Sequence, residues 1–316
     1  MAAGGNLAGT GEDLDLLNTM YTEFRMLRDQ PAVCRKLATS MTLPEGSGST
    51  KNILNYERFV AEELQYGGDI TRSQSLADAN TSYTPNEVGL KCLIPKLTLR
   101  RAPDRGLMGK IAKMMENAYR LKEDADGCAQ FSSWTPIVGT AGTIASPGLI
   151  GAAAARLDIG NNRSNPEPFG QGRKVGVLHP LSMYHVAMRM VPLTDVPVGT
   201  TAYSGVAAGA TVGPGRGGMA DDILKNGPSV VRNVQGVDIY RDANIAVDSN
   251  DDCSGAVFDP EGFVFVSELE ADLNQKTEDP SARSYEIVGN GSYTFGLWRP
   301  GASGVEVFVD ASLPTA

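Results

Sequence analysis

Two histidines are the side chains of this sequence best suited to acid–base chemistry near neutral pH. His179 and His185 are six residues apart, a spacing that places them on different faces of a helix. No G-x-S-x-G motif accompanies them, and neither has a cysteine or aspartate beside it in a recognisable catalytic pattern. Because His179 precedes a proline that can start a helix, we predict capping or packing for it rather than catalysis.

Several acidic residues fall at calcium-ligand spacing. Asp248, Asn250 and Asp252 occupy the first, third and fifth positions of a calcium-binding loop, and Asp259 occupies the twelfth. The sixth position, which requires a tight-turning glycine, is Cys253, and no glutamate closes the loop. We therefore expect a solvated acidic turn without a calcium ion.

The cysteines show no metal-ligand spacing. None belongs to a C-x-x-C pair, and none has the paired histidines of a zinc site. Ordinary reduced thiols are expected, and no metal is predicted. The four residues are Cys34, Cys92, Cys128 and Cys253.

Two glycine-rich segments could be mistaken for phosphate-binding loops. Residues 213–218 lack the Lys-Ser/Thr pair of a P-loop, so a flexible loop is favoured. Residues 138–142 have glycines three apart rather than two, which favours a glycine-bearing turn into a helix. With no selected pair of carboxylates either, the sequence predicts no enzyme, no catalytic residue and no cofactor.

Composition indicates a globular protein that binds nucleic acid weakly, if at all, over its surface as a whole. Of 316 residues, 41% are hydrophobic and 21% charged, and 36 glycines plus 18 prolines indicate many turns rather than a helical bundle. A net charge of −9 excludes a basic coat for phosphates. No secretory signal pattern or apolar membrane span is found, so we expect a reducing, cytoplasm-like compartment and no membrane.

The first hundred residues predict an arm and a projecting loop. Helical spacing at 13–29 and 31–41 is followed by linker composition at 45–50, so residues 1–50 form the predicted arm. Strands at 53–60 and 88–94 flank a polar, glycine-bearing tip at 67–85, which we expect not to contribute to the core. We expect these strands to form a two-stranded ribbon that needs a neighbouring surface, because isolated ribbons are marginally stable.

The rest of the chain mixes helices with strands. Residues 107–121 give the clearest helix, with Leu107, Ile111, Met114, Met115, Ala118 and Leu121 on one side. Prolines at 147 and 180 start two further helices, and a strand is predicted at 174–178. A short helix is expected at 220–225, and strands at 230–234, 237–240, 256–258, 262–266, 285–288, 293–298 and 305–309.

Charge divides the sequence. Residues 91–122 contain nine basic and two acidic residues, a balance of +7, whereas residues 242–286 contain twelve acidic and two basic residues, a balance of −10. Opposed charges of this kind can guide the docking of neighbouring copies. Solvated faces of one subunit are the alternative, and the sequence leaves both open.

The order of elements resembles the major capsid protein family of tailed bacteriophages, particularly podovirus-like coat proteins. Strand, turn and helix at 174–184 and the apolar strand, Trp298-Arg299-Pro300 turn and final strand at 293–308 resemble the family most. The resemblance implies an α+β, Hong Kong 97-type fold. Its expected parts are an N-terminal arm at 1–50, an extended loop at 51–103, a peripheral domain with the spine helix at 104–144 and 266–316, and an axial domain at 145–265.

The resemblance further implies a structural protein that self-assembles, through pentamers and hexamers, into an icosahedral shell around double-stranded DNA. Expected partners are scaffolding, portal and decoration proteins, and the expected location is the virion capsid after assembly in the host cytoplasm. Subunit-interface residues are predicted at Phe59, Arg100, Arg101, Glu268 and Glu270. An encapsulin shell with a cargo enzyme, or a cytosolic hydrolase or oxidoreductase, are the alternatives.

Overall fold

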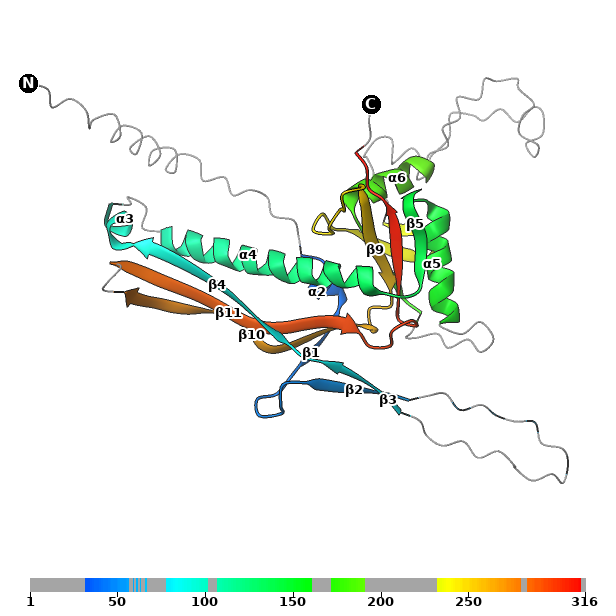
Figure 1. Cartoon of the computed structure of the whole chain (residues 1–316), viewed down its shortest axis with the longest axis horizontal. Helices are drawn as coiled ribbons and strands as arrows, with labels where there is room; N and C mark the ends of the chain where they lie inside the picture. Colours follow the sequence, from blue (N-terminus) through cyan, green and yellow to red (C-terminus); the bar gives the residue numbers. More distant parts are fainter. Residues whose placement is uncertain are drawn as a thin grey trace, which may run out of the picture.

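The computed structural model describes residues 32–56, 59, 61, 63, 66, 78–101, 107–160, 172–190, 232–279 and 283–313. Figure 1 shows an elongated part, with a long helix beside long strands, joined to a compact part. Within the described residues, no helix is long and apolar enough to cross a membrane. The elements are α2 Cys34–Leu37, β1 Thr39–Thr42, β2 Lys51–Tyr56, β3 Asp78–Tyr83, β4 Asn86–Pro95, α3 Lys96–Arg101, α4 Leu107–Ala129, η1 Gln130–Ser133, β5 Ile137–Ile144, α5 Pro147–Ile159, β6 Lys174–Leu178, α6 Pro180–Met190, β7 Asn233–Val234, β8 Val237–Arg241, β9 Asp252–Phe258, β10 Phe263–Asp279, β11 Ser284–Leu297 and β12 Gly304–Asp310.

The elongated part is a four-stranded sheet in the order β1-β10-β11-β4. Strands β10 and β11 form a long antiparallel hairpin, β4 pairs antiparallel with β11, and β1 runs parallel to β10. Alternate side chains of β10 reach different hydrophobic clusters: Phe263 and Phe265 join the main core, whereas Val264 and Val266 pack with Ile53. The period of two thus gives both faces of this strand a buried role.

Helix α4 confirms the predicted long helix but presents a different face to the protein. Met115 is buried and Ile111 packs beside it, whereas Met114 and Leu121 are 52% and 44% exposed. The predicted apolar side was therefore partly wrong, because it combined two neighbouring stripes of the helix. The buried stripe runs at i, i+4 spacing from Ile111 through Met115 and Tyr119 to Glu123.

The compact part is a six-stranded sheet in the order β5-β12-β9-β6-β8-β7, packed with α5 and α6 (Figure 1). Its strands β6 and β9 are almost wholly buried, as expected for the central strands of a covered sheet. Both predicted proline starts are confirmed, and Ser146 caps α5 by accepting a hydrogen bond from the Leu149 amide at 3.3 Å.

An aromatic cluster joins the two parts. Phe131, from η1 at the end of α4, has its ring centroid 5.0 Å from Trp134 and 6.1 Å from Phe263 of β10. Trp134 lies edge-on to Phe258 of β9, with centroids 5.6 Å apart. Because these rings come from both sheets, a single continuous core connects the elongated and compact parts.

The ribbon predicted in the first hundred residues pairs differently from the prediction. Strand β2 pairs with β3, from Lys51↔Tyr83 to Tyr56↔Asp78, and β4 pairs with β11 instead. Tyr83, within the tip predicted at 67–85 to lie outside the core, is 6% exposed and donates a hydrogen bond to the Leu297 carbonyl. The expectation that this whole tip is separate from the core was therefore wrong.

Other predicted elements also changed. The helix predicted at 31–41 is only α2, followed by strand β1, and the turn predicted at 138–142 is strand β5. The strands predicted at 285–288 and 293–298 are one strand, β11, and both β5 and β12 lie in the six-stranded sheet. Predictions at 13–29 and 220–225 fall outside the described residues. The sheets therefore cross the predicted limits of the peripheral and axial domains.

Candidate functional site

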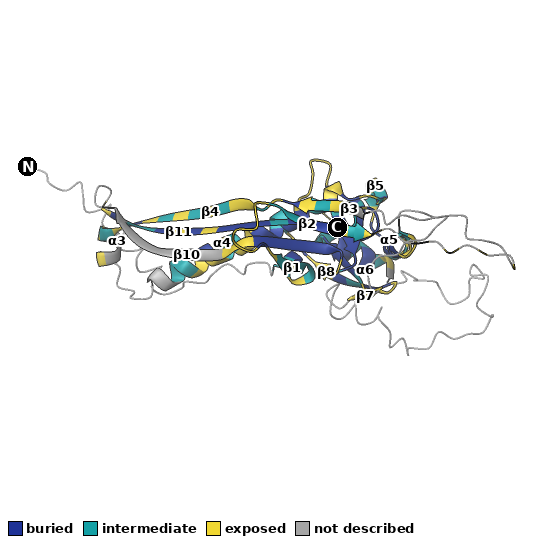
Figure 2. Cartoon of the chain, turned by 90° about the horizontal axis from the view of Figure 1, so that it is seen from below, coloured by how far each residue is buried: buried dark blue, intermediate teal, exposed yellow. Residues whose placement is uncertain are grey.

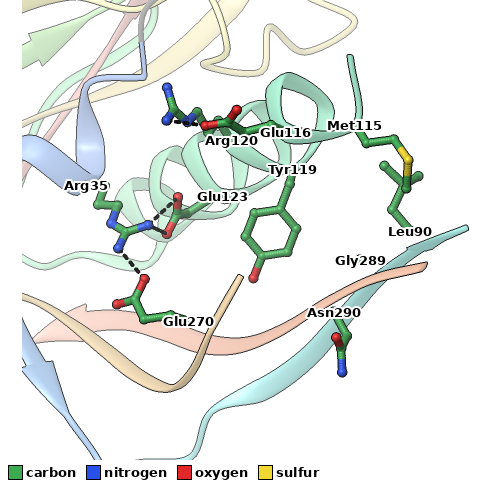
Figure 3. Close-up of a pocket in the computed structure, with 10 residues that line it drawn as sticks. All are labelled: Arg35, Leu90, Met115, Glu116, Tyr119, Arg120, Glu123, Glu270, Gly289 and Asn290. Carbon is green, nitrogen blue, oxygen red and sulfur yellow. Dashed lines mark hydrogen bonds and ion pairs between the residues drawn. The ribbon is translucent and has the colours of Figure 1, made fainter. Parts of the chain in front are cut away.

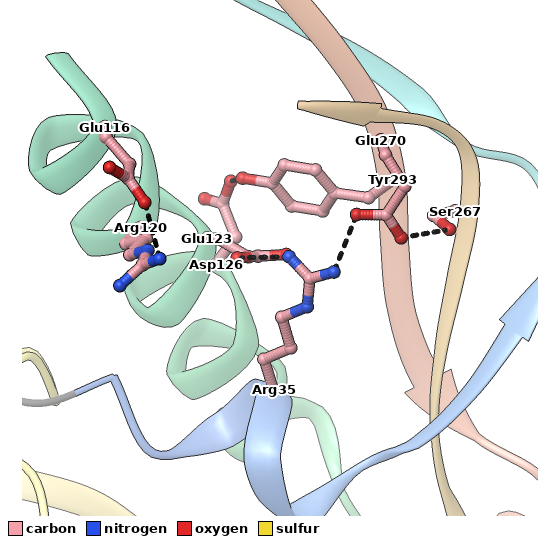
Figure 4. A network of polar contacts seen from close by, with 8 residues as sticks. All are labelled: Arg35, Glu116, Arg120, Glu123, Asp126, Ser267, Glu270 and Tyr293. Carbon is pink, nitrogen blue, oxygen red and sulfur yellow. Dashed lines mark hydrogen bonds and ion pairs between the residues drawn. The ribbon is translucent and has the colours of Figure 1, made fainter. Parts of the chain in front are cut away.

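Three separate elements meet at one arginine, where the chain leaves the N-terminal segment. Arg35 of α2 donates to Glu123 of α4 at 3.1 Å and to Glu270 of β10 at 2.7 Å. Figure 4 shows its guanidinium reaching between the helix and the strand. A planar guanidinium with several donors can hold two carboxylates at once, so Arg35 links α2, α4 and β10.

The two carboxylates of this network have different surroundings. The Glu123 side chain is 3% exposed, and burial raises its pKa although the charge of Arg35 acts in the opposite direction. The Glu270 side chain is 62% exposed and also accepts a hydrogen bond from Ser267. Arg35 also lies 5.0 Å above the Phe265 ring. The buried Glu123 is thus the member that most needs its partner.

Two further contacts extend the network along α4. Tyr293 of β11 donates to Asp126 at 2.9 Å, and Arg120 pairs with Glu116 on the outer side of the helix. Burial is the first cause of a raised pKa at Tyr293, and it raises the pKa of Tyr119 to about 12. Both tyrosines therefore remain protonated near neutral pH. Tyr293 acts as a donor, and the Tyr119 ring packs edge-on against it.

A pocket of about 250 Å³ lies between α4 and the hairpin (Figure 3). Its charged lining includes Arg35, Glu116, Arg120, Glu123 and Glu270, and each of these forms an ion pair within the lining. Groups already paired to one another hold elements together rather than activate a substrate. The geometry of this pocket supports a positioning role.

The structure places the predicted interface residues at separate positions on the surface. Phe59 is 58% exposed, Arg100 lies exposed on α3, and Arg101 ends that helix. Glu268 and Glu270 lie close together on β10, where Glu268 accepts a hydrogen bond from Ser292 at 3.3 Å. The network with Arg35 gives Glu270 a role inside the chain. Their contacts between subunits stay a prediction.

Other residues singled out from the sequence have local roles. His179 accepts a hydrogen bond from the Leu181 amide at 3.3 Å, which confirms a capping role. Asp248 and Asp259 lie beyond opposite ends of the seven-residue strand β9, too far apart to hold one ion. Asp252 and Asp259 are buried, so the predicted solvated turn is correct only around Asp248.

The opposed charge stretches meet partly within one chain. Lys91 of β4 pairs with Glu286 of β11 at 2.7 Å, because the two strands are neighbours in the sheet. For this pair the attraction acts within one chain, and docking and solvated faces remain the two expectations for the other residues of both stretches. Arg35 and Glu123 were missed, although the i, i+4 spacing from Met115 through Tyr119 could have indicated a buried glutamate that needs a cation.

Comparison with solved structures identifies the fold. The chain resembles the head protein of Helicobacter pylori bacteriophage KHP40 with a TM-score of 0.65, 7% identity and coverage of 92% of this chain and 95% of that one. The capsid protein of cyanophage P-SCSP1u gives 0.63, 15%, and 92% of both chains. The SrpI encapsulin of Synechococcus elongatus gives 0.55, 8%, and 96% and 98%.

The sequence itself matches no protein-family model and no curated protein. At these low identities the shared feature is the fold, which extends over nearly the whole length of each chain compared. The helices and mixed sheets described above agree with the capsid proteins in their arrangement. The chain therefore has the α+β fold of tailed-phage major capsid proteins.

Proposed function

We propose that the chain is a major capsid protein that self-assembles, through pentamers and hexamers, into an icosahedral shell around double-stranded DNA. The observation that carries the proposal is the match to capsid proteins over 92% of this chain, which includes the elongated part as well as the compact part. In this proposal the chain needs no catalytic step. It works in the virion capsid, after assembly in the host cytoplasm with scaffolding, portal and decoration proteins.

The parts of the fold map onto the Hong Kong 97-type plan in this proposal. The β2–β3 ribbon is the extended loop, α4 is the spine helix of a peripheral domain formed with the four-stranded sheet, and the six-stranded sheet forms the axial domain. This assignment moves β4 out of the extended loop and β12 out of the peripheral domain. It follows the strand pairing instead of the sequence limits.

Exposed apolar side chains on the elongated part support association with other copies. Leu93, Leu97 and Met114 are 54%, 56% and 52% exposed. Figure 2 shows exposed residues recurring along β4 on this thin part of the molecule. Burying apolar surface against a neighbour is favourable by about 25 cal/mol per Å², so such side chains gain most from a shell.

Distance along β11 argues that Arg100 and Glu268 pair between copies and not with each other in one chain. Pro95, the last residue of β4 before α3, pairs with Ser284, whereas Glu268 lies where β10 pairs with Ser292 and Tyr293. Eight residues of β11 separate these positions, about 27 Å of strand. Arg100 and Glu268 are therefore too far apart to pair in one chain, and a neighbouring copy is the partner we propose.

Electron microscopy of the purified, concentrated chain tests the proposed function. We expect closed shells, or their pentamers and hexamers, with or without a co-expressed scaffold. A chain that stays monomeric at high concentration, in raised salt and with its scaffold would refute shell formation.

Charge reversal tests the proposed interface separately. The double variant Arg100→Glu and Arg101→Glu is expected to assemble several-fold more slowly and to respond less to salt, and Glu268→Lys to restore part of the rate. Arg232→Glu with Arg241→Glu changes the net charge equally on exposed residues of the compact part and serves as the control. Equal rates for both double variants across a salt series would contradict the interface but leave the shell untouched.

An encapsulin-type shell is the second candidate, because the SrpI encapsulin shares the fold with a TM-score of 0.55. The content of purified shells distinguishes the two functions. Nuclease-resistant DNA inside shells assembled with the other proteins of the particle supports the capsid, whereas a single co-purifying protein supports the encapsulin.

A further inference from the structure

Two cysteines that are far apart in the sequence meet in the core beside α2. The Sγ atoms of Cys34 and Cys128 are 3.4 Å apart, and Cys128 Sγ lies 3.5 Å from Oδ2 of Asp242. One ligand atom from each of these three residues lies within 4.8 Å of the others. All three residues are buried, with at most 4% of their surface exposed.

These distances are close to the edges of a tetrahedral zinc site. Zinc binds thiolate sulfur at about 2.3 Å and carboxylate oxygen at about 2.0 Å, which gives S···S edges of about 3.8 Å and S···O edges of about 3.5 Å. The two sulfur atoms would need to move apart by a few tenths of an ångström, and the third pair, Cys34 and Asp242, lies within 4.8 Å. Thiolates favour zinc and similar soft ions over magnesium or calcium.

The neighbouring residues orient these groups. Asp124 accepts hydrogen bonds from the amides of Val33 and Cys34, each at 2.8 Å, and from the Asn244 side chain at 2.7 Å. The Asn244 amide donates to Oδ1 of Asp242 at 2.9 Å, which leaves Oδ2 directed at Cys128. Hydrogen bonds of this kind hold the metal-binding side chains in position in known metal sites.

The local charge also favours a cation. Asp124 and Asp242 are fully buried, and in the described part of the chain neither carboxylate has an ion pair with a lysine, arginine or histidine. Burial, followed by the contact with Asp124, raises the pKa of Asp242 to about 7. Two buried carboxyls and two thiols without a positive partner are costly unless they are protonated or bind a metal.

We propose that Cys34, Cys128 and Asp242 bind one zinc ion, with Asp124 as the positioning residue. Binding replaces the two S–H protons by two Zn–S bonds and releases those protons, together with the proton of Asp242 when it carries one. The ion joins α2, the end of α4 and the segment after β8. It therefore fastens the first described helix to the long helix α4 and to the six-stranded sheet.

Metal content of the unassembled chain tests this site independently of shell formation. After purification from zinc-supplemented medium, we expect one zinc per chain by mass spectrometry of the metals. Replacement by Co²⁺ should give the near-ultraviolet sulfur-to-cobalt charge-transfer absorption that reports thiolate ligands. Chelation should lower the melting temperature.

Matched variants assign the ligands. Cys34→Ser and Cys128→Ser should lose the metal, and Asp242→Asn should weaken zinc binding at least tenfold. Cys253→Ser is the control, because Cys253 is equally buried but contacts Ser182 instead. Three results would each overturn the proposal. The first is less than 0.1 zinc per wild-type chain in excess Zn²⁺, and the second is a cobalt spectrum without the charge-transfer band. The third is a Cys34–Cys128 disulfide, which lowers the mass by two hydrogens. Titration of the wild-type chain with Zn²⁺ tests the site even if a serine variant does not fold.

Discussion

Replacing Arg35 with methionine is the most direct test of the network between α2, α4 and β10. The change removes both ion pairs and leaves Glu123, whose side chain is 3% exposed, without a cation. At 3.1 Å and an effective dielectric constant of about 20, the Arg35–Glu123 attraction has an upper bound of about 5 kcal/mol. Because Arg35 is 38% exposed, solvent screens the pair, and we expect a loss of about 2 kcal/mol of unfolding free energy at pH 8.

The pH dependence of this loss follows from Glu123. Burial raises the pKa of Glu123 in the folded protein, and loss of Arg35 raises it further. A carboxyl whose folded pKa exceeds its unfolded value stabilises the fold at low pH, and this stability is lost as pH rises through the folded pKa. The variant should therefore approach the wild type in stability as pH falls toward 5.

Urea unfolding of the unassembled chain, followed by fluorescence of the buried Trp134, measures both effects. Arg120→Met is the matched control, since it removes only the exposed i,i+4 pair with Glu116 and should cost at most about 0.5 kcal/mol. Adding Glu123→Gln to Arg35→Met should recover part of the stability. Equal losses for Arg35→Met and Arg120→Met at pH 8 would refute the assignment of Glu123 as a dependent buried charge.

Three further tests use substitutions at other sites. In Gly139→Ala the new Cβ would lie 2.1 Å from the Phe308 carbonyl oxygen, so we expect urea unfolding to show a loss above about 3 kcal/mol of unfolding free energy. The control Gly142→Ala has open space around it and should lose only about 1 kcal/mol to backbone strain. Similar losses for the two variants would contradict this reasoning. Phe131→Ala should open a cavity between the sheets and cost about 3–5 kcal/mol of stability in thermal unfolding. Phe59→Ala, at an exposed position, should leave monomer stability unchanged and reduce shell yield. The reverse pattern would contradict core packing by Phe131 and subunit contact by Phe59. Burial raises the pKa of Glu306, so the wild type should lose stability as pH rises from about 4.5, and Glu306→Gln should flatten that profile; an unchanged slope would exclude Glu306 as a contributor.

Capping residues, prolines and apolar spacing predicted many helices and strands, because these elements depend on residues that are close in the sequence. Ser146 followed by Pro147 fixes the start of α5 through the hydrogen bond to Leu149, and the i, i+4 apolar spacing after Leu107 fixes α4. The long strand β11 was divided in the prediction because the polar Gly289–Ser292 stretch looks like a turn. In the structure, pairing with β4 and β10 on both sides supplies hydrogen bonds that composition does not reveal.

The sheets and the candidate sites depend on contacts that sequence spacing does not encode. Arg35 and Glu270 are separated by 235 positions, and Cys34 and Cys128 by 94, yet both pairs meet beside α2. Apolar and polar residues alternate along β4 as they would in a two-stranded ribbon. This pattern could therefore not show whether β11 or β2 is the partner of β4. The overall resemblance predicted the fold because the order of elements survives even where identity falls to 7%.

The position of Arg35 connects these local and distant features. It lies on the first described helix, inside the segment predicted as the arm, and its two carboxylates belong to α4 and to the β10–β11 hairpin. Cys34, the preceding residue, turns toward Cys128 and the end of the same helix. A displacement of α2 would therefore disturb α4 and β10 together, because ion pairs and packing join them at adjacent residues. If assembly displaces α2, Arg35 and Cys34 are the residues through which that displacement reaches both α4 and β10.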